Sequence, residues 1–248
     1  ESKHFLFSGA TGSGKTQGIN KLLGTIRERG VKAIIADAGA AAVEVFYQPG
    51  DIILNPFDSR SVHWSPFLEL ATDGHDASAI AKAAIPDAAG DSQEWHAYAQ
   101  TFLAETILAL SKRGVRSVPE LLDTLVQSDA NTLRLLLSGT PAQILCQEGN
   151  EKMLSNTRAI IGLSLVAWKR LKSDASFSVR NWVRDESCRN WLFITYREDQ
   201  YETLKRFVST LLDLAIMETL SLPENDKRQI WFVMDEVDSL GKISSLRN

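Results

Sequence analysis

The stretch GATGSGKT, residues 9–16, constrains the fold of this chain more than any other feature. It matches G-x-x-x-x-G-K-[ST], the pattern of a P-loop, in which the backbone N–H groups of a glycine-rich turn surround phosphate groups. The pattern predicts that Lys15 reaches the β- and γ-phosphates of a nucleotide and that the hydroxyl of Thr16 binds Mg²⁺. An apolar run precedes the loop and a helical pattern follows it, as a P-loop requires. The residues expected to bind the nucleotide are therefore Gly9, Ala10, Thr11, Gly12, Ser13, Gly14, Lys15 and Thr16.

A second stretch, WFVMDE at 231–236, supplies the carboxylates that a P-loop works with. An apolar strand that ends in Asp235 places a carboxylate at the ligand-binding edge of the sheet, where it can hold Mg²⁺ together with Thr16. Glu236 is suited to polarise an attacking water, which favours a hydrolysing motor over a kinase. A solvated acidic turn that includes Asp238 is the alternative. The expected catalytic residues are Lys15, Asp235 and Glu236, and the expected cofactors are ATP and Mg²⁺.

The chain has strand and helix signals at both ends and only helix signals between them. Apolar runs predict strands of a mainly parallel sheet at 4–8, 31–37, 51–55, 190–196 and 229–235. Capping boxes predict helix starts at Asp91 with Glu94, Ser117 with Glu120 and Asp199 with Glu202. We therefore expect an α/β nucleotide-binding domain, made of residues 1–71 and 176–248, that is interrupted by an all-helical domain at 72–175.

The overall charge limits how this chain can contact nucleic acid. With 27 basic and 31 acidic residues the net charge is −4, so a general attraction to DNA is not expected, although a few local basic side chains suffice where DNA is held in a pore. The notable basic cluster is AWKRLK, residues 167–172, with Arg180 and Arg184 after it. A solvated helix face is the preferred interpretation of this cluster, and a DNA contact is the alternative.

Compartment and membrane signals are few. Cys146 and Cys188 have no CxxC partner, which is typical of a reducing compartment, and no run of 18 apolar residues could cross a membrane. We expect a chain that is soluble in the cytoplasm.

Two further polar residues follow predicted strands and have two possible interpretations each. Arg197 could approach the phosphates or a neighbouring subunit, but a local salt bridge with Glu198 or Asp199 is preferred. Asp37 could lie beside the ligand or could form the turn after its strand, and the sequence does not choose between these.

An ordered series of stretches carries a more specific signal than the P-loop. DIILNPFDSRSVHWSPF, EWHAYAQTFLAETILAL, FSVRNWV, WLFITYRED and IWFVMDEVDSLGKISSL follow the loop in this order. The series resembles the type IV coupling proteins of bacterial conjugation, the TrwB and TraD group, over essentially the whole chain. The resemblance implies a RecA-like P-loop ATPase with an inserted all-helical domain, anchored at the cytoplasmic face of the bacterial inner membrane. It also implies hexameric rings related to FtsK-type DNA translocases.

The same resemblance implies partners. Such proteins bind DNA without marked sequence preference and link a relaxase bound to a single strand with the channel of a type IV secretion system. Two alternatives stay open: another hexameric P-loop motor of the FtsK type, and a docking module in which nucleotide mainly stabilises the ring and the helical domain recruits protein substrates.

The chain departs from the family pattern at two places. Family members often carry Asp-Pro-x-Gly followed by an acid after the second strand, whereas Asp37-Ala38-Gly39-Ala40 stands here without the second carboxylate. The sequence also ends 13 residues after Asp235 (Asn248). We expect the later strands, the sensor motif, the arginine finger and the membrane anchor to lie outside this chain, which leaves its own ATP turnover open.

Overall fold

The computed structural model describes residues 5–9, 14–71, 76–236, 243 and 245–246. In these residues four strands form one parallel sheet in the order β2–β3–β1–β4. The strands are β1 (Lys32–Ala38), β2 (Ile52–Leu54), β3 (Leu192–Tyr196) and β4 (Ile230–Met234). Each falls within one residue of a run predicted from the sequence, and the parallel order confirms the α/β fold class.

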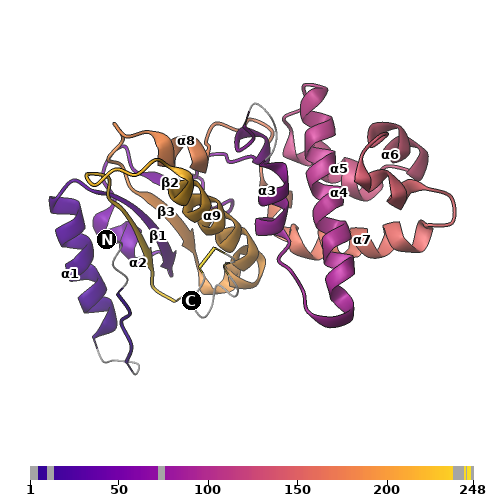
Figure 1. Cartoon of the computed structure of the whole chain (residues 1–248). Coiled ribbons are helices and arrows are strands. Elements are labelled where there is room, and N and C mark those ends of the chain that lie inside the picture. The colour runs from indigo at the N-terminus through magenta and orange to yellow at the C-terminus, as the bar shows by residue number, and fades with distance from the viewer. Residues whose placement is uncertain (1–4, 10–13, 72–75, 237–242, 244, 247–248) are drawn as a thin grey trace.

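Helices cover both faces of the sheet (Figure 1), which is why its strands are apolar along nearly their whole length. One face packs against α1 (Lys15–Glu28) and α2 (Ala41–Phe46), whose residues Leu23, Ile26 and Val43 share a cluster with Ile35 of β1. The other face packs against α8 (Val179–Arg184) and the long helix α9 (Tyr201–Ser221). The predicted inward residues of α9 are confirmed, since Leu204, Phe207, Leu211 and Ala215 are buried and Leu214 is partly buried against the same cluster.

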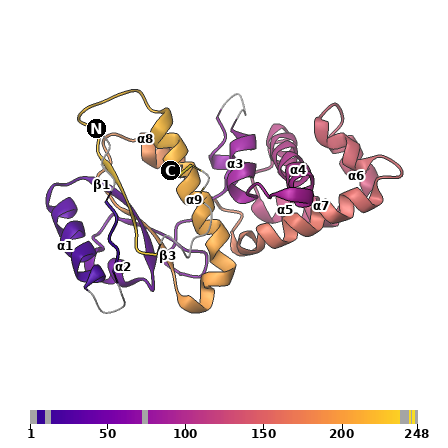
Figure 2. The same ribbon diagram turned by 60° about the horizontal axis from the view of Figure 1, so that its bottom comes forward.

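The middle of the chain is helical. Its α-helices are α3 (Ala77–Ala84), α4 (Gln93–Lys112), α5 (Val118–Gln127), α6 (Ala130–Leu136) and α7 (Glu151–Ser164). The short 3-10 helices of the chain are η1 (Pro66–Leu68), η2 (Gly90–Ser92), η3 (Pro141–Cys146), η4 (Val166–Arg170) and η5 (Glu198–Gln200). Figures 1 and 2 show α4 to α7 to one side of the sheet, with α3 between α4 and α9.

The described residues 76–175 contain no strand, as the sequence predicts. How the chain divides into domains stays a prediction, and its first boundary falls at residues 72–75, outside the described residues. The helical part and the sheet share one apolar cluster that includes Ile34, Phe102 and Phe207. Trp64 stands in that cluster, with its ring edge-on to Trp168 at 5.3 Å between centroids.

Three local predictions differ from the structure. The described residues 5–9 lie in no strand, and β4 is an edge strand of the described sheet. Phe5 instead stacks on Trp231 of β4, with ring centroids 6.1 Å apart. Asp91 does not cap α4, because η2 precedes that helix and its N-cap Ser92 makes no side-chain bond. Asp199 does not cap α9, because it lies in η5 and the N-cap of α9 is Gln200, whose side chain makes no capping bond to that helix; Asp199 pairs with Arg197.

One predicted cap is confirmed. The hydroxyl of Ser117 accepts a hydrogen bond from the N–H of Glu120 at 3.3 Å and so begins α5. None of the described helices combines the length and the apolar character that crossing a bilayer demands.

Candidate nucleotide-binding site

The amino end of α1 has the features of an anion site. Gly14, its N-cap, has φ 88°, in the left-handed region that favours glycine, and a Cβ there would meet nothing within 4 Å. Gly14 is therefore required by the backbone conformation and not by crowding. The helix has no side-chain cap and no acidic residue in its first turn, so its positive dipole end is available to an anion.

Helix and strand lengths place this end of α1 at the carboxyl edge of the sheet. The 14 residues of α1 span about 21 Å, and the seven of β1 span about 23 Å. α1 ends at Glu28 and β1 begins at Lys32, so the two elements run in opposite directions from a shared end. The amino end of α1 is consequently level with the point where β1 and β4 finish, as Figure 1 shows.

The predicted acidic pair follows β4 at this same edge. Met234 lies opposite Ala36 of β1, and the N–H of Asp235 donates to the carbonyl of Ala36 at 3.4 Å. Asp235 and Glu236 are both exposed. The structure thus brings Gly14, Lys15 and Thr16 to the sheet edge that carries Asp235 and Glu236.

The remaining loop residues are placed only in part. Ala10, Thr11, Gly12 and Ser13 lie outside the described residues. The ammonium of Lys15 donates to the carbonyl of Gly9, so the two ends of the loop are linked by the side chain that the pattern assigns to phosphate.

Asp37 is the turn-forming residue that the sequence left as one of two possibilities. Its carboxylate is 3% exposed and accepts hydrogen bonds from the N–H groups of Ala42 at 2.9 Å and Val43 at 2.8 Å. Burial raises the pKa of this carboxyl group, and the neighbouring carboxylate of Asp235 raises it further. Asp37 therefore holds the turn into α2 and lies next to the candidate magnesium ligand.

Arg197 makes the local salt bridge that the sequence favours. Its guanidinium donates to both carboxylate oxygens of Asp199, at 3.0 and 2.8 Å, and both side chains are more than 60% exposed. No contact in the described part of the chain directs it toward the candidate site.

Comparison with known proteins places the chain in a family. Residues 1–248 match the family described as the type IV secretion-system coupling protein DNA-binding domain. This chain belongs to that family. The match covers the P-loop, the helical middle and the acidic strand together, so the resemblance seen in the sequence is confirmed.

Relatives of the family member described here include proteins of conjugation. The chain is 32% identical to the coupling protein TraD of Escherichia coli K12 over 254 residues, which is 99% of this chain and 35% of TraD. It is 34% identical to the unbound bacterial conjugative coupling protein TrwB, with a TM-score of 0.87, over 95% of this chain and 57% of that one. TrwB in complex with the non-hydrolysable analogue ADPNP, and with ADP and Mg²⁺, gives TM-scores of 0.86 at the same identity and coverage. The chain spans about a third of TraD and just over half of the TrwB chain in the solved structure.

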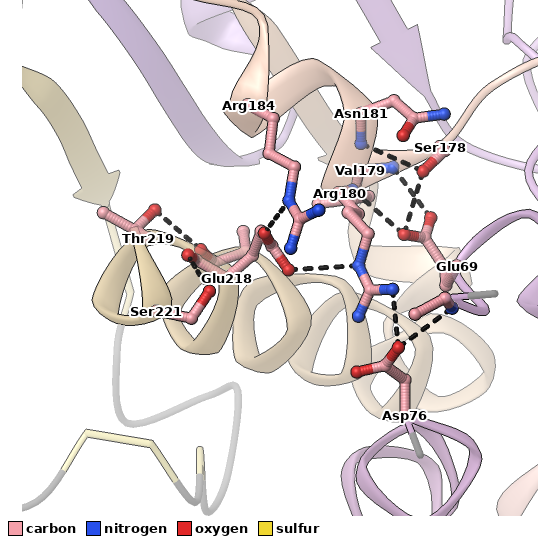
Figure 3. A network of polar contacts seen from close by, with 12 residues as sticks. Glu69, Asp76, Ser178, Val179, Arg180, Asn181, Arg184, Glu218, Thr219 and Ser221 are labelled. Carbon is pink, nitrogen blue, oxygen red and sulfur yellow. Dashed lines mark hydrogen bonds and ion pairs between the residues drawn. The ribbon is translucent and has the colours of Figure 1, made fainter. Parts of the chain in front are cut away.

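A second polar site in this family member was not predicted from its sequence. Glu69 is 2% exposed, and its carboxylate accepts four hydrogen bonds. The donors are the indole of Trp64 (2.7 Å), the hydroxyl of Ser178 (3.1 Å) and the N–H groups of Val179 (2.7 Å) and Arg180 (2.9 Å), most of which Figure 3 shows. Burial raises the pKa of this carboxyl group, although the four donors oppose the rise. An acidic residue inside the apolar stretch PFLEL is the only sequence signal of this role.

Arg180 extends this polar site to α3 and α9. It donates to Asp76 at 2.6 Å and to Glu218 at 3.1 Å, and Arg184 also pairs with Glu218 (Figure 3). The side chain of Arg180 is only 14% exposed, so the prediction of a solvated helix face is wrong for this residue. Its pairing with two carboxylates gives no support to a DNA contact. The network ties the start of α3 to α8 and α9, where the chain leaves the sheet and returns to it.

Proposed function

We propose that this chain is the nucleotide-binding core of a coupling protein that hydrolyses ATP and helps to pump DNA into a type IV secretion channel during conjugation. The observation that carries the proposal is the position of Gly14, Lys15 and Thr16 at the sheet edge that also carries Asp235 and Glu236. TrwB, whose structure superposes on this chain, is known in complex with ADPNP and with ADP and Mg²⁺. ATP and Mg²⁺ are the corresponding ligands proposed here.

The described residues fit an anionic nucleotide. The left-handed Gly14, the uncapped end of α1 and the absence of an acid in the first turn of that helix all favour phosphate at this position. Gly9 to Thr16 would surround the phosphates, with Lys15 at the β- and γ-phosphates. Bound ATP supplies the phosphoanhydride bond whose hydrolysis drives movement.

Three side chains would serve the reaction. The hydroxyl of Thr16 and the carboxylate of Asp235 would hold Mg²⁺, either directly or through water. The carboxylate of Glu236 would accept a proton from the attacking water and orient it. Asp37 stays outside this set because the turn into α2 uses its carboxylate.

Membership of the family supports a proposal for assembly and partners. We infer that the protein forms a homo-hexamer at the cytoplasmic face of the bacterial inner membrane. Its partners would be DNA, bound without sequence preference, the relaxase that delivers a single strand, and components of the secretion channel. The family description as a DNA-binding domain supports the first of these.

The test is DNA-stimulated ATP hydrolysis by wild type, Lys15→Ala and Glu236→Gln. We expect DNA to stimulate the wild type and neither variant. Glu236→Gln should keep the rise in melting temperature that Mg-ATP produces by binding the folded state, and Lys15→Ala should lose it. A wild type that neither binds DNA nor responds to it contradicts the translocase proposal. A Lys15→Ala variant that still supports plasmid transfer would identify a docking module instead.

A further inference from the structure

A cleft lies at the sheet edge opposite the candidate nucleotide site. It has a volume of about 410 Å³ and is formed by three separate segments, 29–32, 183–189 and 225–230. Lys32 begins β1 and Ile230 begins β4, whereas Asp37 and Asp235 stand at the other ends of these strands. In Figure 1, α8, the last turn of α1 and the connection from α9 to β4 meet at this edge.

Basic residues dominate the lining of the cleft. Its charged residues are the cations Arg29, Lys32, Arg189, Lys227 and Arg228 and the acids Asp185 and Glu186. The whole chain carries a net charge of −4, so this excess of positive charge is local. A concave surface with an excess of one sign of charge concentrates ions of the opposite sign.

One of the cations, Lys32, is buried and serves the structure of the cleft. Lys32 is 5% exposed, and its ammonium donates to the carbonyls of Trp182 at 2.5 Å and Asp185 at 2.7 Å. These carbonyls lie at the carboxyl end of α8, where the last carbonyls of a helix have no partner within it. Lys32 therefore positions α8 and is not available to a ligand.

The two acids are engaged within the cleft wall. The carboxylate of Glu186 pairs with Arg228 at 2.5 Å. The carboxylate of Asp185 accepts hydrogen bonds from the N–H of Ser187 at 2.9 Å and from its hydroxyl at 2.6 Å. Arg228 offsets the charge of Glu186, whereas Asp185 keeps its negative charge. The five cations against two acids still leave an excess of three positive charges in the lining.

Three cations remain for a ligand. Arg29 and Lys227 are exposed, and within the described part of the chain neither forms an ion pair. Arg189 donates to the backbone carbonyls of Glu186 and Cys188 and forms no ion pair with a carboxylate among the described residues. A guanidinium offers several N–H donors in one plane and an ammonium offers three, so both suit the oxygens of a phosphate group.

We propose that this cleft binds the phosphate groups of single-stranded DNA through Arg29, Arg189 and Lys227. The proposal rests on the proposed function, since that function makes DNA the ligand. The cleft is at the small end of ligand pockets, which suits a short stretch of one strand. None of the described residues that line it is aromatic, so base stacking would not contribute to binding. Contacts to phosphates alone carry no sequence information, which agrees with DNA binding that has no sequence preference.

No pattern in the sequence indicates this cleft, because its cations come from three segments far apart in the chain. The basic cluster that the sequence does show is used otherwise, with Arg180 and Arg184 paired to carboxylates and Arg170 over the ring of Phe57. Only the parallel sheet, which brings the segments before β1 and β4 to one edge, assembles the site.

The test measures binding of a fluorescent 20-nucleotide oligo-dT as a function of salt. The variant is Arg29→Glu with Lys227→Glu, and the matched control is Lys112→Glu with Lys152→Glu, which makes the same charge change at exposed sites on α4 and α7. The slope of log K against log salt is negative, and each lost phosphate contact makes it less steep by about 0.7 for a single strand. For the cleft variant, which loses two contacts, we expect a slope that is less steep by about 1.4 and an affinity for oligo-dT that is about tenfold weaker near physiological salt. The control should keep both.

Several outcomes would overturn the inference. Equal binding by wild type and the cleft variant places the DNA elsewhere and leaves the proposed function intact, whereas a wild type that binds no DNA contradicts both. Equal losses in the cleft variant and the control indicate a general charge effect. Variant-dependent binding to phosphatidylserine vesicles without variant-dependent binding to oligo-dT would make the cleft a lipid site. The rise in melting temperature with Mg-ATP, expected to be the same in all these proteins, reports that each variant is folded.

Discussion

The guanidinium of Arg180 lies 2.6 Å from the carboxylate of Asp76, a residue 104 positions earlier in the chain. The same guanidinium contacts Glu218 near the end of α9. One side chain on α8 therefore links the first helix of the helical part with the long helix that covers the sheet. Since all three side chains are less than 15% exposed, this ion pairing is shielded from water, and its loss leaves two carboxylates partly buried.

Replacing Arg180 by Gln should therefore destabilise the protein strongly. We expect the free energy of unfolding to fall by about 3 kcal/mol, because Asp76 and Glu218 each lose a shielded ion pair with Arg180, while Glu218 keeps its pair with Arg184. Denaturation by urea measures this change. The matched control is Arg197→Gln, whose partner Asp199 is 65% exposed, and it should cost less than about 1 kcal/mol. Equal effects of the two substitutions would contradict the role given to Arg180.

The sequence predicts the sheet and the P-loop well because their signals are local. Buried parallel strands are continuous apolar runs, and the loop is one uninterrupted motif. Relations between distant segments have no such signal: nothing in the order of residues links Arg180 to its partner Asp76, or brings Arg29 and Lys227 to one cleft. The start of α4 was also mispredicted, because Asp91 has the residue type of a cap and yet lies in η2, one residue before the N-cap Ser92.

Glu69 should give the stability a characteristic dependence on pH. Burial raises the pKa of its carboxyl group above the usual 4.5, so the folded state binds a proton more tightly than the unfolded state. The contribution of this group to stability is complete below pH 4.5 and is lost as the pH rises through the folded pKa. The free energy of unfolding of wild type minus that of Glu69→Gln should accordingly decrease over this range. A difference that grows with pH would mean that the four hydrogen-bond donors outweigh burial.

Asp37 and Asp235 are neighbours at one sheet edge and should respond differently to the same substitution. Asp37→Asn weakens the turn into α2 and should cost about 1 kcal/mol of stability, with the affinity for Mg-ATP unchanged. Asp235→Asn should leave stability unchanged and reduce the affinity for Mg²⁺ at least about tenfold, as the loss of a group that holds a metal through water does. Urea denaturation and magnesium titration of nucleotide binding separate the two. A reduced affinity for Mg²⁺ in Asp37→Asn would contradict this division and indicate that Asp37 also holds Mg²⁺.

Ala40 offers a stabilising substitution at the point where this chain departs from the family pattern. It has φ 59°, which places a residue with a Cβ in the left-handed region, and it is the one described residue other than glycine with a positive φ. This conformation costs a residue with a Cβ about 1–2 kcal/mol, whereas glycine adopts it freely but loses more entropy on folding. Ala40→Gly should therefore raise the free energy of unfolding by about 0.5–1 kcal/mol. The control Ala41→Gly, in the first turn of α2, should lower it by up to about 1 kcal/mol, because glycine is a poor helix former. Stabilities that change in the same direction in both variants would show that the left-handed backbone at Ala40 carries no strain.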